Sequence, residues 1–437
     1  MSSERHAAPA PRPRARAASR ERARTALRAP PLGRLLRSLR GLLGPGDTAR
    51  QSLVALTLNS ATSLVAGAFL GSITGTFEEL PGLLVLVPAA IGLRGNVFST
   101  FGNRLSTSIH TGTFELTLRR DSMLVQNVLA SLVLTAAMSV VLAVVAKIVA
   151  VALGVPDTVS VLSLAMISVV GGMLASLIVL LASVGLAAGA VRYGWDLDNV
   201  VAPLVSTLGD VLTLPALWLA AFMVLISTLS HVLGIVVIVI SLAAFVWALV
   251  SRAPVLRQVT RESWPVLVVA IVLSSLAGIV LQQRLGTFAR YPALLVLMPA
   301  FVSSAGALGG ILASRLSSKL HLGFMTPSWL PDPEARPDAL SIMLLGAPVY
   351  LFNAVGAHLV ATALGQASPG LLPMIGASMI GGFFAVAFVV AIAYYGTIAA
   401  VGLRVDPDTY GIPIVTSSVD FVGAVALITA AVALHIT

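Results

Sequence analysis

Long apolar segments alternate with short polar connections along most of the chain after residue 50. A membrane-spanning helix needs about 20 apolar residues, and segments of this kind recur throughout. Eleven of them lie near 52–74, 81–108, 123–153, 158–191, 199–228, 233–250, 264–283, 292–318, 340–365, 370–400 and 409–434. The pattern predicts an all-α polytopic membrane protein with about eleven transmembrane helices.

The composition agrees with a membrane protein. Of the 437 residues, 57% are hydrophobic and 10% are charged, whereas soluble domains carry about 25% charged residues. The chain contains no cysteine, which excludes disulfides, thiolate metal sites and cysteine nucleophiles. The sequence also lacks a phosphate-binding loop, so we expect no ATP-driven transport. Separately, we expect that the protein is not an enzyme.

The positive charge of the chain is concentrated at its N-terminus. Residues 1–50 hold twelve arginines against three acids, which accounts for the net charge of +9. Basic segments favour the cytoplasmic side of a membrane and attract anionic lipid. We therefore expect residues 1–49 to form a disordered cytoplasmic tail beside the lipid bilayer, with no nucleic-acid partner. An organellar transit peptide is the alternative.

Two pairs of segments show that the chain is internally repeated. "PGLLVLVPAAIGLRGNVFSTFGNRLSTSIHTG" (81–112) aligns without gaps to "PALLVLMPAFVSSAGALGGILASRLSSKLHLG" (292–323), at an offset of 211 positions. "DLDNVVAPLVSTLGD" (196–210) and "DPDTYGIPIVTSSVD" (406–420) both read D-x-D-x4-P-x6-D. Apolar composition alone does not place aspartates and a proline in register, so we infer two five-helix repeats.

The number of spans sets the relative direction of the repeats. A five-span repeat enters on one side of the membrane and leaves on the other, and the span near 233–250 returns the chain. The repeats then run parallel, related by an axis along the membrane normal. We expect a monomeric pseudo-dimer in the cytoplasmic membrane, with its N-terminus inside and its C-terminus outside. The expected parts are the tail (1–49), the first repeat (50–230), a linking helix with a basic loop (231–262) and the second repeat (263–437).

Asp210 and Asp420 lie near the middle of the fifth span of each repeat. A charged side chain at the bilayer centre costs about 2.5–3.5 kcal/mol on insertion scales. Two close carboxylates repel each other unless a cation lies between them, and Mg²⁺ prefers carboxylate and water oxygens. The pair predicts a site for a divalent cation, with a purely structural hydrogen-bonded pair as the alternative.

Other polar residues occur at matching positions of the same spans. One helical turn before the two aspartates lie the hydroxyl residues Ser206, Thr207, Thr416 and Ser417. This spacing places them on the helix face of the aspartates, where we expect them to bind the water shell of the ion. The spans begin with Asp196, Asp198, Asp406 and Asp408. These acids are helix caps, and we also expect them to concentrate cations at a pore entrance.

The segments "PAAIGLRGNVFSTFGNRLSTSIHTG" and "DLDNVVAPLVSTLGD" resemble the membrane domain of MgtE-type magnesium transporters. The closer resemblance is to the solute carrier family 41 branch, in which two such five-helix units share one chain. The resemblance implies a central pore between the second and fifth spans of the repeats. It implies ion binding at Asp210 and Asp420, and it maps a Gly-Asn segment onto Gly95 and Asn96. Asn96 is a candidate contact of the ion, with a polar contact between helices as the alternative. The second repeat departs from it, with Ala307 in place of asparagine.

We therefore expect transmembrane transport of a divalent cation, with Mg²⁺ as the first candidate. The sequence leaves open a channel or an exchanger with Na⁺ as the coupling ion. Another divalent cation such as Mn²⁺ is the alternative cargo, although an all-oxygen site disfavours softer metals. An intramembrane aspartyl protease is a remote alternative, because "LGD" (208–210) partly matches a GxGD motif but "SSVD" (417–420) lacks glycine.

Overall fold

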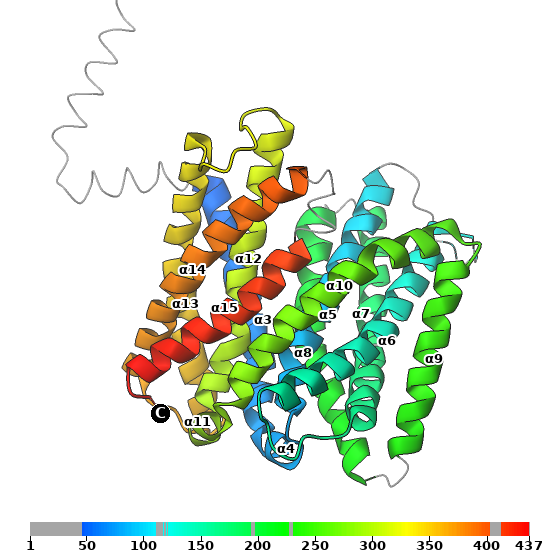
Figure 1. Ribbon diagram of the computed structural model, residues 1–437. Helices are drawn as coiled ribbons and strands as arrows, with labels where there is room; N and C mark the ends of the chain where they lie inside the picture. The colour runs from blue at the N-terminus through cyan, green and yellow to red at the C-terminus, as the bar shows by residue number, and fades with distance from the viewer. Residues whose placement is uncertain are drawn as a thin grey trace, which may run out of the picture. The chain divides into compact units, whose positions relative to one another are not determined.

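The computed structural model describes residues 46–110, 117, 119, 121–193, 197–226, 230–402 and 412–436. Nearly all of the predicted tail lies outside these residues. The chain divides into two compact units, 1–51 and 52–437, and the second contains the apolar helices. The helices in chain order are α3 (Gly46–Ser72), α4 (Thr74–Glu79), α5 (Leu83–His110), α6 (Met123–Ala152), α7 (Val161–Tyr193), α8 (Leu197–Ile226), α9 (Ser230–Val250), α10 (Pro254–Gln282), α11 (Leu285–Arg290), α12 (Ala293–His321), η1 (Pro333–Ala335), α13 (Arg336–Ala363), α14 (Leu371–Gly402) and α15 (Ile412–Ala433) (Figure 1).

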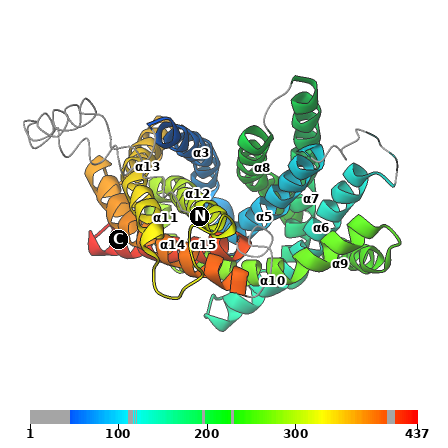
Figure 2. The same cartoon turned by 90° about the horizontal axis from the view of Figure 1, so that it is seen from above.

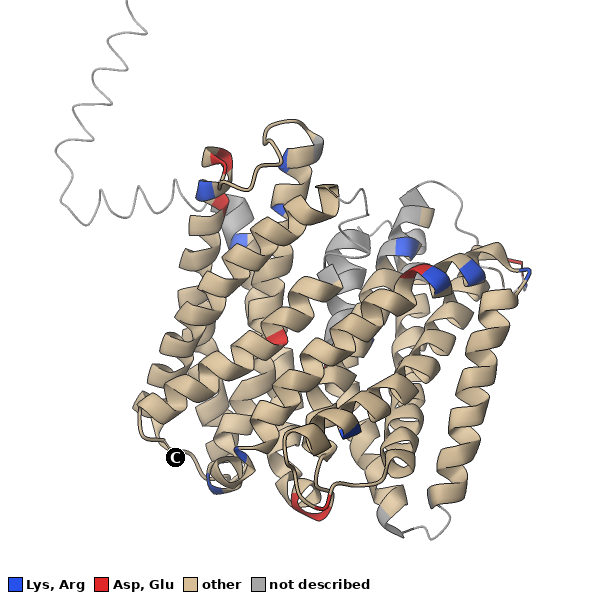
Figure 3. Cartoon of the chain, in the orientation of Figure 1, with Lys and Arg blue, Asp and Glu red and all other residues tan. Residues whose placement is uncertain are grey.

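The predicted all-helical membrane architecture is confirmed. Among the described residues, ten helices are long and apolar enough to cross a membrane, and α8 contributes a shorter apolar stretch, Leu208–Val224. Among the described residues, the positions of Lys, Arg, Asp and Glu lie mostly near the two ends of the helices and are sparse between them (Figure 3). The linking helix α9 exposes most of its apolar side chains, as expected for a helix that faces lipid.

The two repeats adopt matching local structure at a constant spacing. Helix α6 begins after Ser122, whose hydroxyl caps the helix by accepting a 3.2 Å hydrogen bond from the N–H of Val125. It ends before Gly154, and its counterpart α13 ends before Gly365; these glycines have φ of +76° and +70°. Glycine adopts this left-handed conformation without steric cost. The repeat read from the sequence is therefore also a repeat in structure.

The first helix of the first repeat packs against the second repeat. The Oγ of Ser60 on α3 lies 3.0 Å from that of Ser304 on α12. A Cβ added to Gly67 would lie 2.1 Å from the backbone oxygen of Val296 on α12. The absence of a side chain at Gly67 thus lets the two backbones touch, and Figure 2 shows α3 beside α12 and α13.

The first helix of the second repeat makes the reciprocal contact. A Cβ added to Gly278 on α10 would lie 2.2 Å from the backbone oxygen of Val85 on α5. The N–H of Val255, also on α10, donates a 3.0 Å hydrogen bond to the side chain of Gln126 on α6. The repeats therefore exchange their first helices. We call α5–α8 with α10 the first half of the molecule, and α12–α15 with α3 the second half.

These close contacts give a prediction about stability. Gly67→Ala or Gly278→Ala should separate α3 from α12 or α10 from α5, because neither backbone oxygen can move aside. Overpacking of this kind costs about 1–3 kcal/mol, so the melting temperature in detergent should fall. The matched controls are Gly75→Ala and Gly286→Ala, where an added Cβ meets nothing within 4 Å. Equal melting temperatures for all four variants would contradict the exchange of helices.

Candidate cation site

A central cavity of about 260 Å³ lies between the two halves. Its walls come from α3, α5, α8, α10, α12 and α15. The sequence predicted the second and fifth helices of each repeat at this place, and the structure adds the two exchanged first helices. A water molecule needs about 10–15 Å³ of such space. The cavity therefore has room for an ion together with waters of its hydration shell.

Helices α5 and α12 line the central cavity with the same seven positions of the repeat, the first of which are Val87 and Met298. The other six are Pro88, Ile91, Gly92, Gly95, Asn96 and Ser99 on α5, and Pro299, Val302, Ser303, Gly306, Ala307 and Gly310 on α12. Steps of three and four residues place each set on one helix face. Small residues dominate both sets, which leaves the space open. The two faces differ in polarity, since Asn96 is matched by Ala307.

Asp210 and Asp420 both line the central cavity and are partly buried. The Ser274 hydroxyl on α10 donates a 2.7 Å hydrogen bond to Oδ2 of Asp420 on α15. Asp210 on α8 interacts with the Ser303 hydroxyl on α12, and it also feels the charge of Asp420. Each carboxylate is thus held by a hydroxyl from the opposite half. The two negative charges act on each other across one space.

Ser303 joins Asp210 to the exchanged helix α3. The Asn59 side chain on α3 donates a 3.1 Å hydrogen bond to the Ser303 oxygen, and the Asn59 oxygen lies 3.2 Å from that hydroxyl. Asn59 also lines the central cavity. Its amide oxygen could serve as a further neutral ligand beside the first carboxylate.

Asn96 carries an amide that is only partly satisfied. Its oxygen accepts a 3.4 Å hydrogen bond from the Thr416 hydroxyl on α15, while its Nδ2 is buried without a partner. A half-turn of the amide would let Nδ2 donate to Thr416 instead. That rotation frees the oxygen, which is the atom that a cation binds.

The remaining predicted residues fall in different places. Thr416 lines the central cavity, whereas Ser417 is buried beside it and is not part of its lining. The side chains of Ser206, Thr207 and Asp198 lie outside the described residues. Asp196, Asp406 and Asp408 also lie outside the described residues.

The sequence analysis missed Asn59, Ser274 and Ser303, because their roles depend on the exchange of the first helices. It also missed Arg94, which is fully buried behind the wall of the central cavity. The Arg94 guanidinium donates hydrogen bonds to the carbonyls of Ala90 and Ser168. A signal for Arg94 was present, since a charged residue in an apolar span is matched by Ala305 in the second repeat.

The donor set of the central cavity suits a hard cation. Among the described residues no group of three or more His, Cys, Asp or Glu side chains gathers in one place. The cavity instead offers two carboxylates with hydroxyl and amide oxygens. Such a set suits a cation that keeps much of its water shell, as Mg²⁺ does.

Comparison with known proteins gives matches over the parts of the chain that contain Asp210 and Asp420. The family model MgtE, described as "Divalent cation transporter", matches residues 87–220 and 298–430. Solute carrier family 41 member 3 of Rattus norvegicus is 26% identical over 413 residues, which cover 89% of this chain and 88% of that protein. Solute carrier family 41 member 2 is 29% identical in Xenopus laevis, over 65% of this chain, and 28% identical in Homo sapiens, over 66% of this chain.

The chain spans about half the length of the two member 2 proteins, 51% in each case. No solved structure gives a significant match. The two matched regions contain both aspartates, Asn96 and Ser303, but they exclude α3 and α10. Asn59 and Ser274 are therefore contributions that only the structure reveals.

Binding of a cation between the aspartates predicts a shift in stability. A ligand at a hundredfold excess over its dissociation constant stabilises the folded state by about 2.7 kcal/mol. Mg²⁺ should therefore raise the melting temperature of the purified protein, and Asp210→Asn or Asp420→Asn should remove most of this shift. Glu262→Gln, which neutralises a partly exposed acid on α10 outside the lining of the central cavity, is the control. An unchanged Mg²⁺ shift in both aspartate variants would contradict binding at this site.

Proposed function

The chain belongs to the MgtE family of divalent cation transporters, and from this premise we propose that it carries Mg²⁺ across the membrane. The ion binds in the central cavity between Asp210 and Asp420. One observation carries the proposal. Two carboxylates from equivalent positions of the repeats line one cavity, and each has a hydroxyl partner from the opposite half.

The chemistry of the cavity supports a hydrated hard ion as the cargo. Two carboxylates balance the charge of one dication, and the neutral oxygens of Asn59, Ser303 and Thr416 can bind its waters. Mg²⁺ gives up its water reluctantly and is usually bound by one or two carboxylates. Mn²⁺ accepts similar oxygen ligands, so it is the competing cargo that the experiment must include.

The binding must also be weak enough for the ion to leave. Asn96 on α5 faces the central cavity, while Ala307 stands at its repeat position on α12. The site is thus symmetric in its charges and asymmetric in its neutral ligands. Such a site holds the ion mainly by charge and leaves part of its water shell free to exchange.

The proposal includes a direction for the chain in the membrane. Arg252, Arg257 and Arg261 lie around the start of α10, and basic loops favour the cytoplasmic side. This end then lies inside the cell, with the N-terminus, and the C-terminus lies outside. The acids that precede the intramembrane aspartates in the sequence, Asp196, Asp198, Asp406 and Asp408, are still predicted from the sequence to attract cations to the pore.

The test is cation entry into liposomes that contain the purified protein and an internal indicator. Wild type should carry Mg²⁺, and Asp210→Asn or Asp420→Asn should reduce the initial rate at least about tenfold, a change of about 1.4 kcal/mol in the barrier. Glu262→Gln should transport like wild type. Parallel assays with Mn²⁺ and Ca²⁺, each with and without a Na⁺ gradient, separate the cargo and the coupling ion.

Each result has a defined meaning. Flux that needs the Na⁺ gradient indicates an exchanger, and flux without it indicates a channel or uniporter. Transport of Mn²⁺ in place of Mg²⁺ would correct the cargo. Undiminished flux in both aspartate variants would refute the central site.

A further inference from the structure

A second, smaller cavity adjoins the central one on the side of the first half. It has a volume of about 10 Å³, which is room for about one water molecule. We call it the side cavity. Asn96 lines both cavities, so its amide forms part of the wall between them.

The side cavity continues along α5 toward the end of the helix that carries Arg104. Asn96, Thr100 and Arg104 all line it, and their spacing of four residues places them along one side of the helix. From Asn96 to Arg104 the helix rises about 12 Å. Ser131 on α6 and Ser263 on α10 complete its polar lining.

The same region of the second half is less polar. The repeat positions of Asn96, Thr100 and Ser131 are Ala307, Ile311 and Ile342. Arg104 and Ser263 have the polar counterparts Arg315 and Ser52. Three of the five polar positions are therefore apolar in the second half, and an apolar wall does not support a chain of waters.

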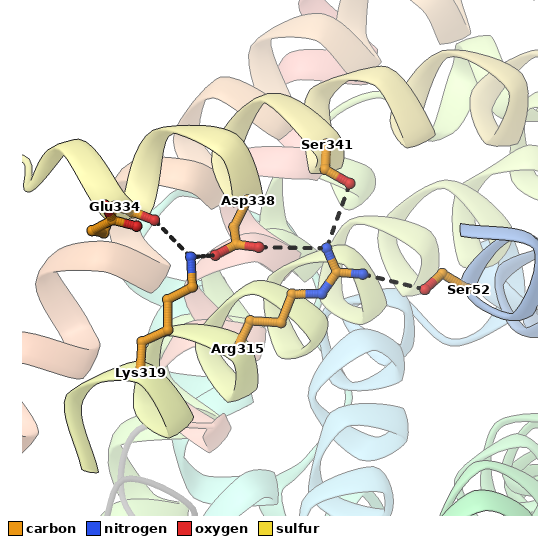
Figure 4. A network of polar contacts seen from close by, with 6 residues as sticks. All are labelled: Ser52, Arg315, Lys319, Glu334, Asp338 and Ser341. Carbon is orange, nitrogen blue, oxygen red and sulfur yellow. Dashed lines mark hydrogen bonds and ion pairs between the residues drawn. The ribbon is translucent and has the colours of Figure 1, made fainter. Parts of the chain in front are cut away.

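The end of the second half is closed by ion pairs (Figure 4). Asp338 on α13 lies 2.6 Å from Lys319 and 3.8 Å from Arg315. Arg315 also donates 3.4 Å hydrogen bonds to Ser341 and Ser52. These contacts hold α12, α13 and α3 together at this end.

The first half differs at three of these five positions. Arg104 donates a 3.4 Å hydrogen bond to Ser263, which matches the contact between Arg315 and Ser52. The counterparts of Asp338, Ser341 and Lys319 are Asn127, Ala130 and Ser108. In the second half the Asp338 carboxylate holds Arg315 and Lys319 together. In the first half the neutral amide of Asn127 takes its place.

We infer that cations and water pass between the central cavity and the Arg104 end along the first half and not along the second. The route lies between α5, α6, α10 and the start of α15, where Pro413 also lines the side cavity. This inference rests on the proposed function. In the present structure the passage is closed, because the side cavity is too small for a hydrated dication and Arg104 repels one. Opening therefore requires Arg104 and the nearby ends of α5 and α10 to move apart.

The absence of native cysteine makes labelling of single introduced cysteines a direct test. We would place Thr100→Cys and Ser131→Cys in the first half, with the matched controls Ile311→Cys and Ile342→Cys in the second. Arg119→Cys, at a side chain with 78% exposure, reports full access. A charged, membrane-impermeant thiol reagent is applied to reconstituted vesicles from either side, and modification is followed by mass spectrometry.

The first-half cysteines should react at least about tenfold faster than the second-half controls. This difference in rate corresponds to about 1.4 kcal/mol in the barrier. Mg²⁺ should slow their reaction. Equal rates in the two halves would overturn the inference, as would failure of both first-half cysteines to react while Arg119→Cys reacts normally.

Flux measurements give a second, independent test. Thr100→Ile with Ser131→Ile gives the first half the residues of the second, and it should abolish transport. The reverse pair, Ile311→Thr with Ile342→Ser, should leave transport unchanged. Normal flux in a folded first-half variant would overturn the inference. Wild-type vesicles that carry no divalent cation would instead refute the proposed function, whatever the labelling shows.

Discussion

A carboxylate in the apolar interior of a membrane protein is stable only where other groups replace the water that it has lost. Asp210 and Asp420 meet this requirement through the hydroxyls of Ser303 and Ser274. The mutual repulsion of the two charges remains, and it is removed only by a proton or by a cation between them. The arrangement of the surrounding helices follows from the need to satisfy both carboxylates at one place.

The exchange of α3 and α10 is what makes this possible. Because Gly67 and Gly278 let backbones touch across the molecule, each first helix reaches the opposite repeat. Ser274 on α10 can then bind Asp420 of its own repeat while α10 packs on α5 of the other. Neither repeat could form this arrangement alone, so the interface that joins the repeats also encloses the proposed cation site.

The repeat, the helices and the two aspartates could be predicted from the sequence. Aspartates and prolines in register reveal a duplication, and the cost of a buried charge identifies Asp210 and Asp420 as candidate site residues. The direction of the exchange could not be predicted. Val85 and Val296 occupy the same position of the repeat, so the sequence permits Gly67 to pack against either one. Only the three-dimensional arrangement distinguishes the two choices.

The same ambiguity explains why Ser303 and Asn59 were missed, because a hydroxyl on α12 becomes a ligand only when the opposite half faces it. Arg94 is a different case. The large Arg94 of the first half is matched by the small Ala305 of the second, whereas the small Ser139 of the first half is matched by the large Tyr350. The two halves therefore fill equivalent interior space with different side chains. A repeat alignment reveals that difference, but it does not reveal that Arg94 lies behind the cavity wall.

The most direct test of the shared site is the stoichiometry of Mn²⁺ bound to the purified protein, measured by electron paramagnetic resonance with Mn²⁺ as a probe for a hard dication. The account predicts one bound Mn²⁺ per chain at saturation, displaced by Mg²⁺ and lost in Asp210→Asn and in Asp420→Asn alike. Two Mn²⁺ ions per chain, or one ion that survives either substitution, would contradict a single cation held between the two halves.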